Sequence, residues 1–126
     1  EGARSLITVD LINRLAEEVK RFDAVIPGVP VKDTIKLTDS QGLVTGTVER
    51  DKLRSIQTPQ VFKKDLIMEA YRRAGAEGFK GTDDSSLVEL MGVEVKVVPG
   101  SYENIKITTP EDLAVAEAIL YRRETG

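Results

Sequence analysis

Two extended runs joined by a polar turn constrain the fold of this chain most. Over residues 29–38, apolar residues with one Asp among them occupy one face of an extended chain, and Lys and Thr occupy the other. Residues 39–42, Asp-Ser-Gln-Gly, are typical of a turn, and residues 43–50 form a second extended run rich in Val and Thr. The pattern predicts a β-hairpin over residues 30–50. Because a hairpin this polar is marginally stable alone, we expect it to lie against another surface, such as a partner subunit.

Helical and extended patterns alternate along the rest of the chain. The predicted helices are 8–19, 63–74, 82–91 and a closing helix that begins at Thr109-Pro-Glu-Asp112; the predicted strands are 24–30, 93–98 and 104–108. Strands separated by helices indicate an α/β fold with a largely parallel sheet.

The composition excludes several kinds of chemistry. The 126 residues include no Cys and no His, which excludes disulfides, thiolate or imidazole nucleophiles and ordinary zinc sites. Any catalysis must use carboxylates, Lys or Arg, hydroxyls, backbone amides or a hard metal ion. The absence of Cys fits a reducing compartment. With no signal peptide and no apolar run of about 18 residues, we expect a soluble, cytoplasmic protein with no membrane partner.

Charge is distributed unevenly along the chain. The net charge is only −3, which gives no reason to expect binding to nucleic acid. Residues 30–64 nevertheless carry seven Lys or Arg against four Asp or Glu, and residues 65–126 carry seven against twelve. A modestly basic segment in an acidic chain indicates a small anionic ligand.

The cations and hydroxyls of the hairpin are the first candidate ligand-binding groups. Lys32, Thr34 and Lys36 share one face at strand spacing, and Arg50 lies at the base of the return strand. Arg binds phosphate through two parallel hydrogen bonds, and a Thr hydroxyl adds a neutral donor. A solvent-exposed ribbon with solvated charges has the same spacing, however, and spacing alone favours that simpler interpretation.

Lys106 is a second candidate because it lies within the predicted strand 104–108, just before a capped helix. Ligands of open α/β sheets bind beyond the carboxyl ends of strands. Periodicity alone favours the alternative, in which Lys106 simply points to water opposite Ile105 and Ile107.

Three shorter segments each have two interpretations. Thr58, in a loop stiffened by Pro59, could bind a base or sugar or only form a turn. The acidic pair at residues 83–84 could bind a metal ion, but helix capping explains it fully. Glu1 and Arg4 flank a short Gly-containing turn, which is a weak signal by itself.

Taken together and in order, these segments resemble the C-terminal half of the 2-C-methyl-D-erythritol 4-phosphate cytidylyltransferase family, which acts in non-mevalonate isoprenoid synthesis. No single segment is decisive, but six in the same order span nearly the whole chain. The matching residues are Glu1-Gly-Ala-Arg4, Pro30-Val-Lys-Asp-Thr-Ile-Lys36, Thr47-Val-Glu-Arg50, Gln57-Thr-Pro-Gln-Val-Phe62, Thr82-Asp-Asp84 and Asn104-Ile-Lys-Ile-Thr-Thr-Pro-Glu-Asp-Leu113.

The resemblance implies a Rossmann-like nucleotidyltransferase fold in which residues 1–126 are the C-terminal part of one domain. A β-arm at about residues 30–54 would embrace a second subunit in a homodimer. Thr34 and Arg50 would reach into the neighbouring subunit's site and hold the phosphate of methylerythritol phosphate there. Lys106 would position the same substrate, and Arg4 would lie near it.

The resemblance also implies the reaction. The substrate phosphate would attack the α-phosphorus of CTP in line and release pyrophosphate with Mg²⁺ present, so that no protein nucleophile is needed. We expect Arg50 and Lys106 to be catalytic, Arg4, Thr34 and Thr58 to bind substrate, and Glu1 to stand where the family has a metal-binding Asp. Ser5 replaces a Pro of the family pattern.

Two alternatives stay open at this point. One is a sister activity on a pentitol phosphate such as ribitol 5-phosphate, and the other is a non-catalytic dimerisation module. The family's Gly-rich, CTP-binding half is not within these residues, so we expect this chain alone to be inactive.

Overall fold

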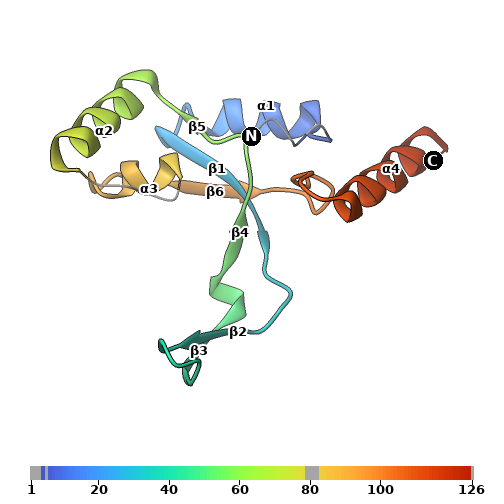
Figure 1. The fold of residues 1–126 in the computed structure, drawn as a ribbon. Coiled ribbons are helices and arrows are strands. Elements are labelled where there is room, and N and C mark those ends of the chain that lie inside the picture. Colours follow the sequence, from blue (N-terminus) through green and yellow to red (C-terminus); the bar gives the residue numbers. More distant parts are fainter. Residues whose placement is uncertain (1–3, 5, 79–82, 126) are drawn as a thin grey trace.

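The computed structural model describes residue 4, residues 6–78 and residues 83–125. A central sheet carries helices on both faces, a hairpin arm projects away from it, and the last helix extends beyond the sheet (Figure 1). The elements follow in this order: α1 (Val9–Glu18), β1 (Ala24–Pro30), β2 (Ile35–Thr38), β3 (Val44–Val48), the 3₁₀ turn η1 (Arg50–Lys52), β4 (Arg54–Ile56), β5 (Val61–Phe62), α2 (Lys64–Glu77), α3 (Asp84–Glu89), β6 (Lys96–Pro99) and α4 (Pro110–Thr125).

The main sheet is built around β1. β6 pairs with one edge of β1 in parallel, whereas β4 and β5 pair with the other edge in the antiparallel sense. The α/β fold class is confirmed, and the sheet is mixed. Its longest ladder is the parallel one, and the shorter ladders are antiparallel because β4 and β5 lie on the return path of the hairpin that leaves β1.

The core lies on both faces of β1, as a near-continuous apolar strand predicts. Consecutive residues of a strand point to opposite faces. Val25 therefore packs with Leu15 of α1 on one face, and Ala24 packs with Ala70 of α2 and Val88 of α3 on the other. Every residue of β1 before Pro30 is buried.

The predicted starts of the first and last helices are confirmed by side-chain caps. Thr8 accepts a hydrogen bond from the backbone amide of Leu11 at the start of α1. At α4, the Thr109 hydroxyl accepts from the Asp112 amide at 3.1 Å, and Asp112 Oδ2 accepts from the Thr109 amide at 3.2 Å. This reciprocal pair satisfies backbone donors at the N-terminus of the helix.

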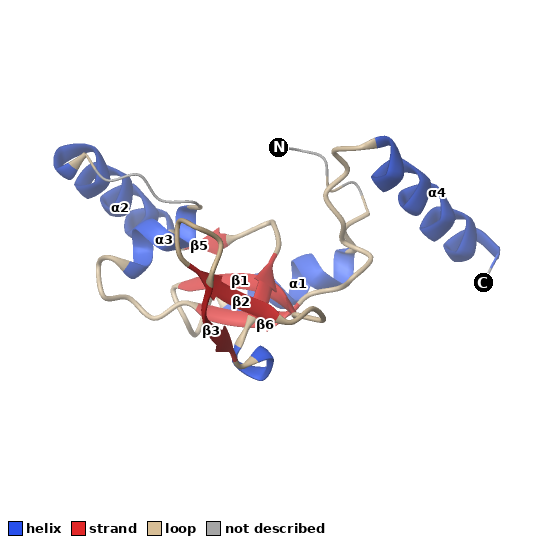
Figure 2. Ribbon diagram, turned by 60° about the horizontal axis from the view of Figure 1, so that its bottom comes forward, coloured by secondary structure: helices blue, strands red, loops and turns tan. Residues whose placement is uncertain are grey.

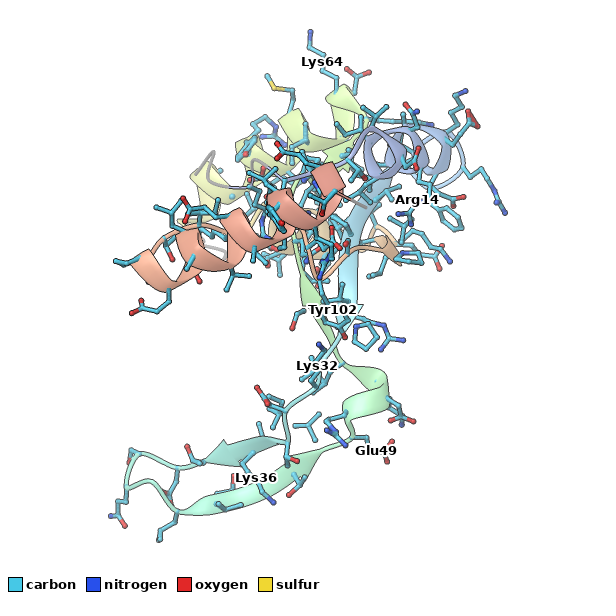
Figure 3. The ribbon with its side chains drawn as sticks, turned by 90° about the vertical axis from the view of Figure 1, so that its right-hand side faces the viewer. Arg14, Lys32, Lys36, Glu49, Lys64 and Tyr102 are labelled. Atoms are coloured by element: carbon cyan, nitrogen blue, oxygen red, sulfur yellow. The ribbon has the colours of Figure 1, made fainter. Side chains whose placement is uncertain are left out.

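The predicted hairpin is present as a separate two-stranded sheet, β2 and β3. In the turn, Asp39 Oδ1 accepts hydrogen bonds from the amides of Gln41 and Leu43. Figure 3 shows the arm standing clear of the rest of the chain, with Lys36 on β2. Leu37 is 56% exposed and Val44 is 60% exposed, so apolar residues of the arm are uncovered in this chain.

The predicted strand over residues 104–108 is wrong, because these residues form an extended loop without strand pairing. Their alternation has another cause. Ile105 and Ile107 pack against Ala116 and Ile119 of α4 and against Leu6, which gives an extended loop the same period of two as a strand. Figure 2 shows α4 beyond the sheet, reached through this segment. Within the described residues, no helix is long and apolar enough to cross a membrane.

Candidate functional site

Three segments that are distant in the sequence meet at Asn104. The Asn104 side chain is only 1% exposed, and its Nδ2 donates to the backbone carbonyl of Thr58 at 2.9 Å. The backbone carbonyl of Asn104 accepts from Arg4 Nη1 at 2.5 Å. Lys106 follows two positions later and is exposed. The structure therefore brings three predicted site residues, Arg4, Thr58 and Lys106, to one region.

Gln57 fixes the loop that carries Thr58. Its Nε2 donates to the carbonyl of Ser101 at 2.8 Å, and its Oε1 accepts from the Ser101 amide at 3.3 Å. The backbone amide of Gln57 donates to the carbonyl of Pro27 in β1. This side chain is buried, so the loop is tied to the segment that follows β6 rather than left in solvent.

Gly100 makes room for that link. A Cβ on Gly100 would lie 2.4 Å from Gln57 Oε1, and Gln57 cannot move away without breaking its bonds to Ser101. We expect Gly100→Ala to lower the free energy of unfolding by about 1–3 kcal/mol, as overpacking does. The control is Gly75→Ala in α2, where an added Cβ meets nothing within 4 Å and helix propensity improves. Urea unfolding measures both, and equal stability of the two variants would contradict this packing.

Asp83 anchors the other end of the loop. Gln60 Nε2 donates to Asp83 Oδ2 at 3.0 Å, and Asp83 Oδ1 caps α3 by accepting from the amide and hydroxyl of Ser86. Partial burial raises the pKa of Asp83, but the hydrogen bonds from Ser86, Gln60 and Ser85 outweigh it and leave the pKa below its ordinary value. The capping interpretation of residues 83–84 is thus confirmed for Asp83.

This lowered pKa predicts a pH effect. A carboxylate with a depressed folded-state pKa stabilises the fold above its unfolded pKa, and that contribution is lost as pH falls through the folded value. Asp83→Asn keeps a capping side chain but does not titrate. We therefore expect wild type to lose more stability than Asp83→Asn in urea titrations between about pH 5 and about pH 2.5. Parallel losses in both proteins would show that Asp83 contributes nothing to the pH dependence.

Of the two predicted residues of the arm, Arg50 is bound within the arm, and the Thr34 side chain has no hydrogen-bond partner among the described residues. The Arg50 guanidinium donates to the backbone carbonyl of Lys32, and Thr34 is exposed. At the root of the arm, Lys32 Nζ lies 3.9 Å from the centre of the Tyr102 ring, and the Tyr102 hydroxyl donates to the carbonyl of Pro30 at 2.6 Å. Figure 3 shows Lys32 and Tyr102 facing each other at this root. The structure does not gather Thr34 and Arg50 with Arg4, Thr58 and Lys106.

A cleft of about 760 Å³ opens between the arm root and the segment after β6. Apolar residues such as Val29 and Val98 line it together with the cations Lys52 and Arg54 and with Asp51. Neither cation was a sequence candidate, although both belong to the basic segment over residues 30–64. The cleft places part of that positive charge beside the segment that leads to Asn104.

The metal prediction for Glu1 lies outside the described residues. Among the residues that the structure does describe, no three acidic side chains gather in a way that could hold a metal ion.

Comparison with solved structures gives the class of the protein. The fold matches the crystal structure of 4-diphosphocytidyl-2C-methyl-D-erythritol synthase from Anaerococcus prevotii with a TM-score of 0.89 and 42% identity, over 95% of this chain and 56% of that chain. It matches 2-C-methyl-D-erythritol 4-phosphate cytidylyltransferase from Thermus thermophilus with a TM-score of 0.82 and 36% identity, over 93% of this chain and 57% of that one. The chain thus has the Rossmann-like nucleotidyltransferase fold.

Sequence comparison narrows this class to one family. The model of the 2-C-methyl-D-erythritol 4-phosphate cytidylyltransferase family matches residues 1–122. Curated relatives with that name include the protein from Caldanaerobacter subterraneus, 54% identical over 95% of this chain and 53% of its own length, and that from Desulforamulus reducens, 50% identical over 98% and 53%. The chain belongs to this family, and it spans about half the length of these relatives.

Proposed function

We propose that this chain is the substrate-binding and dimerisation half of an enzyme that transfers CMP from CTP to 2-C-methyl-D-erythritol 4-phosphate and releases pyrophosphate. It would form the C-terminal part of a single nucleotidyltransferase domain, and its expected location is the cytoplasm. The observation that carries the proposal is that Arg4 and Thr58 meet at Asn104, which lies two residues before the exposed Lys106. Two cations and a hydroxyl at one place suit a phosphorylated polyol.

The proposed reaction needs little from the protein beyond positioning and charge. An oxygen of the polyol phosphate attacks the α-phosphorus of CTP, the bond from that phosphorus to the β-phosphate oxygen breaks, and pyrophosphate leaves. Lys106 would hold the attacking phosphate and offset its charge, which favours the approach of two anions. A chain without His or Cys can support this chemistry because no covalent enzyme intermediate is formed.

Dimerisation through the arm is the second part of the proposal. The arm carries uncovered Leu37 and Val44 next to the predicted phosphate ligands Thr34 and Arg50. A two-stranded ribbon of this kind needs another surface for stability. In a twofold dimer, each arm would cover part of the other subunit and bring its Arg50 to that subunit's Lys106.

The metal requirement remains a proposal as well. Glu1 would be the residue of this chain that holds Mg²⁺, and an ion there would offset negative charge on the phosphates. No step above depends on it.

The test is a fusion in which this chain follows the N-terminal half of the Caldanaerobacter relative. We expect the fusion to form cytidylyl product from CTP and 2-C-methyl-D-erythritol 4-phosphate, and the chain alone to form none. Ribitol 5-phosphate serves as the competing substrate. Preference for ribitol 5-phosphate would replace the proposed substrate, and product formation by the chain alone would refute the division into halves.

A further inference from the structure

Asn104 combines deep burial with an unsatisfied polar atom. The side chain is 1% exposed, and its Oδ1 has no hydrogen-bond partner within the described part of the chain. A buried acceptor without a donor lowers stability. An apolar side chain at this position would avoid that cost but would remove the donor of the Thr58 carbonyl, so the bond to Thr58 is what the amide contributes.

The Asn104 side chain contacts a main-chain carbonyl and another buried amide. Nδ2 donates to the carbonyl of Thr58 and lies 3.5 Å from Gln57 Oε1, and the Asn104 backbone amide donates to the carbonyl of Ser101. The bond from Asn104 Nδ2 fixes the position of the Thr58 backbone. The Thr58 side chain takes no part in that bond and is left available for a substrate. Lys106 lies two residues after Asn104 in the chain, so the bonds of Asn104 also limit where the Lys106 backbone can lie.

We propose that Asn104 is a positioning residue of the substrate site, whose amide sets the separation between the Thr58 hydroxyl and the Lys106 ammonium group. This inference rests on the proposed function, in which both groups contact the polyol phosphate. Asn104 itself touches no substrate, because its side chain is enclosed by protein. A displacement of about 1 Å in a positioned group can cost about 100-fold in rate, so a single main-chain bond can matter this much.

The kinetic test uses the fusion described above, with two variants of Asn104. Asn104→Ala removes the amide, and Asn104→Asp keeps its size but cannot donate to the Thr58 carbonyl when ionised. We expect kcat/KM for 2-C-methyl-D-erythritol 4-phosphate to fall by about 10- to 100-fold in both, with KM for CTP changed by less than about twofold. A purely structural role would lower the amount of folded enzyme without this difference between the two substrates.

Val88→Ala is the control, because it removes buried apolar volume in the core beside α3 and leaves the hydrogen bonds of Asn104 and Gln57 in place. We expect Val88→Ala to lower thermal stability at least as much as Asn104→Asp, but to change KM for the polyol phosphate by less than about threefold. Equal KM changes in the two variants would overturn the inference.

A second measurement separates this inference from the proposed function. Amide NMR spectra of the chain itself report whether the positions of Thr58 and Lys106 both depend on Asn104. We expect Asn104→Asp to shift the Thr58 and Lys106 resonances together, whereas Val88→Ala in the core beside α3 shifts neither. If the wild-type fusion is inactive, the proposed function fails while this measurement still decides the structural coupling. If both resonances stay in place, or if the active fusion keeps its KM in both Asn104 variants, the inference is wrong.

Discussion

Arg50→Ala in the active fusion is expected to lower kcat/KM for the polyol phosphate by about 100- to 1,000-fold, the range seen when one donor to a developing charge is removed. Arg50 is exposed and its guanidinium donates to the carbonyl of Lys32, so this side chain can turn toward a phosphate at the cost of one surface hydrogen bond. Steady-state kinetics with varied polyol phosphate measure the effect. KM for CTP should change little, because the arm is not expected to contact the nucleotide.

The control for Arg50 is Arg73→Ala on α2, which removes the same charge at a distant surface pair with Glu69. This variant should keep wild-type kinetics. Size-exclusion chromatography of the Arg50 variant then checks that the oligomer persists. Unchanged turnover in a persisting dimer would mean that the arm is structural only, which is the non-catalytic alternative left open by the sequence.

Leu15→Ala is expected to lower the free energy of unfolding by about 2–5 kcal/mol. Leu15 is fully buried where α1 meets Val25 and Val98 of the sheet, so the deletion leaves a cavity that the two rigid layers cannot close. Urea unfolding followed by circular dichroism measures the change. Ile12→Ala, on the same helix but 46% exposed, should cost far less, and equal losses would contradict the assigned packing of α1.

The sequence predicted those elements whose local residue pattern is compatible with one kind of secondary structure. Residues 24–30 are a continuous apolar run that only a strand buried on both faces explains, and the Thr109–Asp112 pattern specifies its own cap. The hairpin followed in the same way from its turn residues. In each case the residues that decide the structure are neighbours in the chain.

The wrong and missing predictions concern residues whose structure is determined by segments distant in the sequence. The alternation of Ile105 and Ile107 is the same for a strand and for a loop packed under α4, so period alone gave the wrong element. Asn104 was noticed only within a matched segment, and its role depends on Thr58 and Arg4, which lie far from it in sequence. Of the missed residues, Gly100 and Tyr102 offered a local signal, because they lie in the turn that follows a predicted strand.

In the proposed dimer the arm of each subunit completes the site of the other, and mixing two inactive variants tests this arrangement. Arg50→Ala and Lys106→Ala fusions, each inactive, are unfolded together, refolded and assayed. If Arg50 acts on the partner's site, each mixed dimer holds one intact site, and random mixing restores about a quarter of wild-type activity. If the mixture stays as inactive as its two components while mixed dimers form, Arg50 does not act on the partner's site, and the proposed role of the arm is wrong.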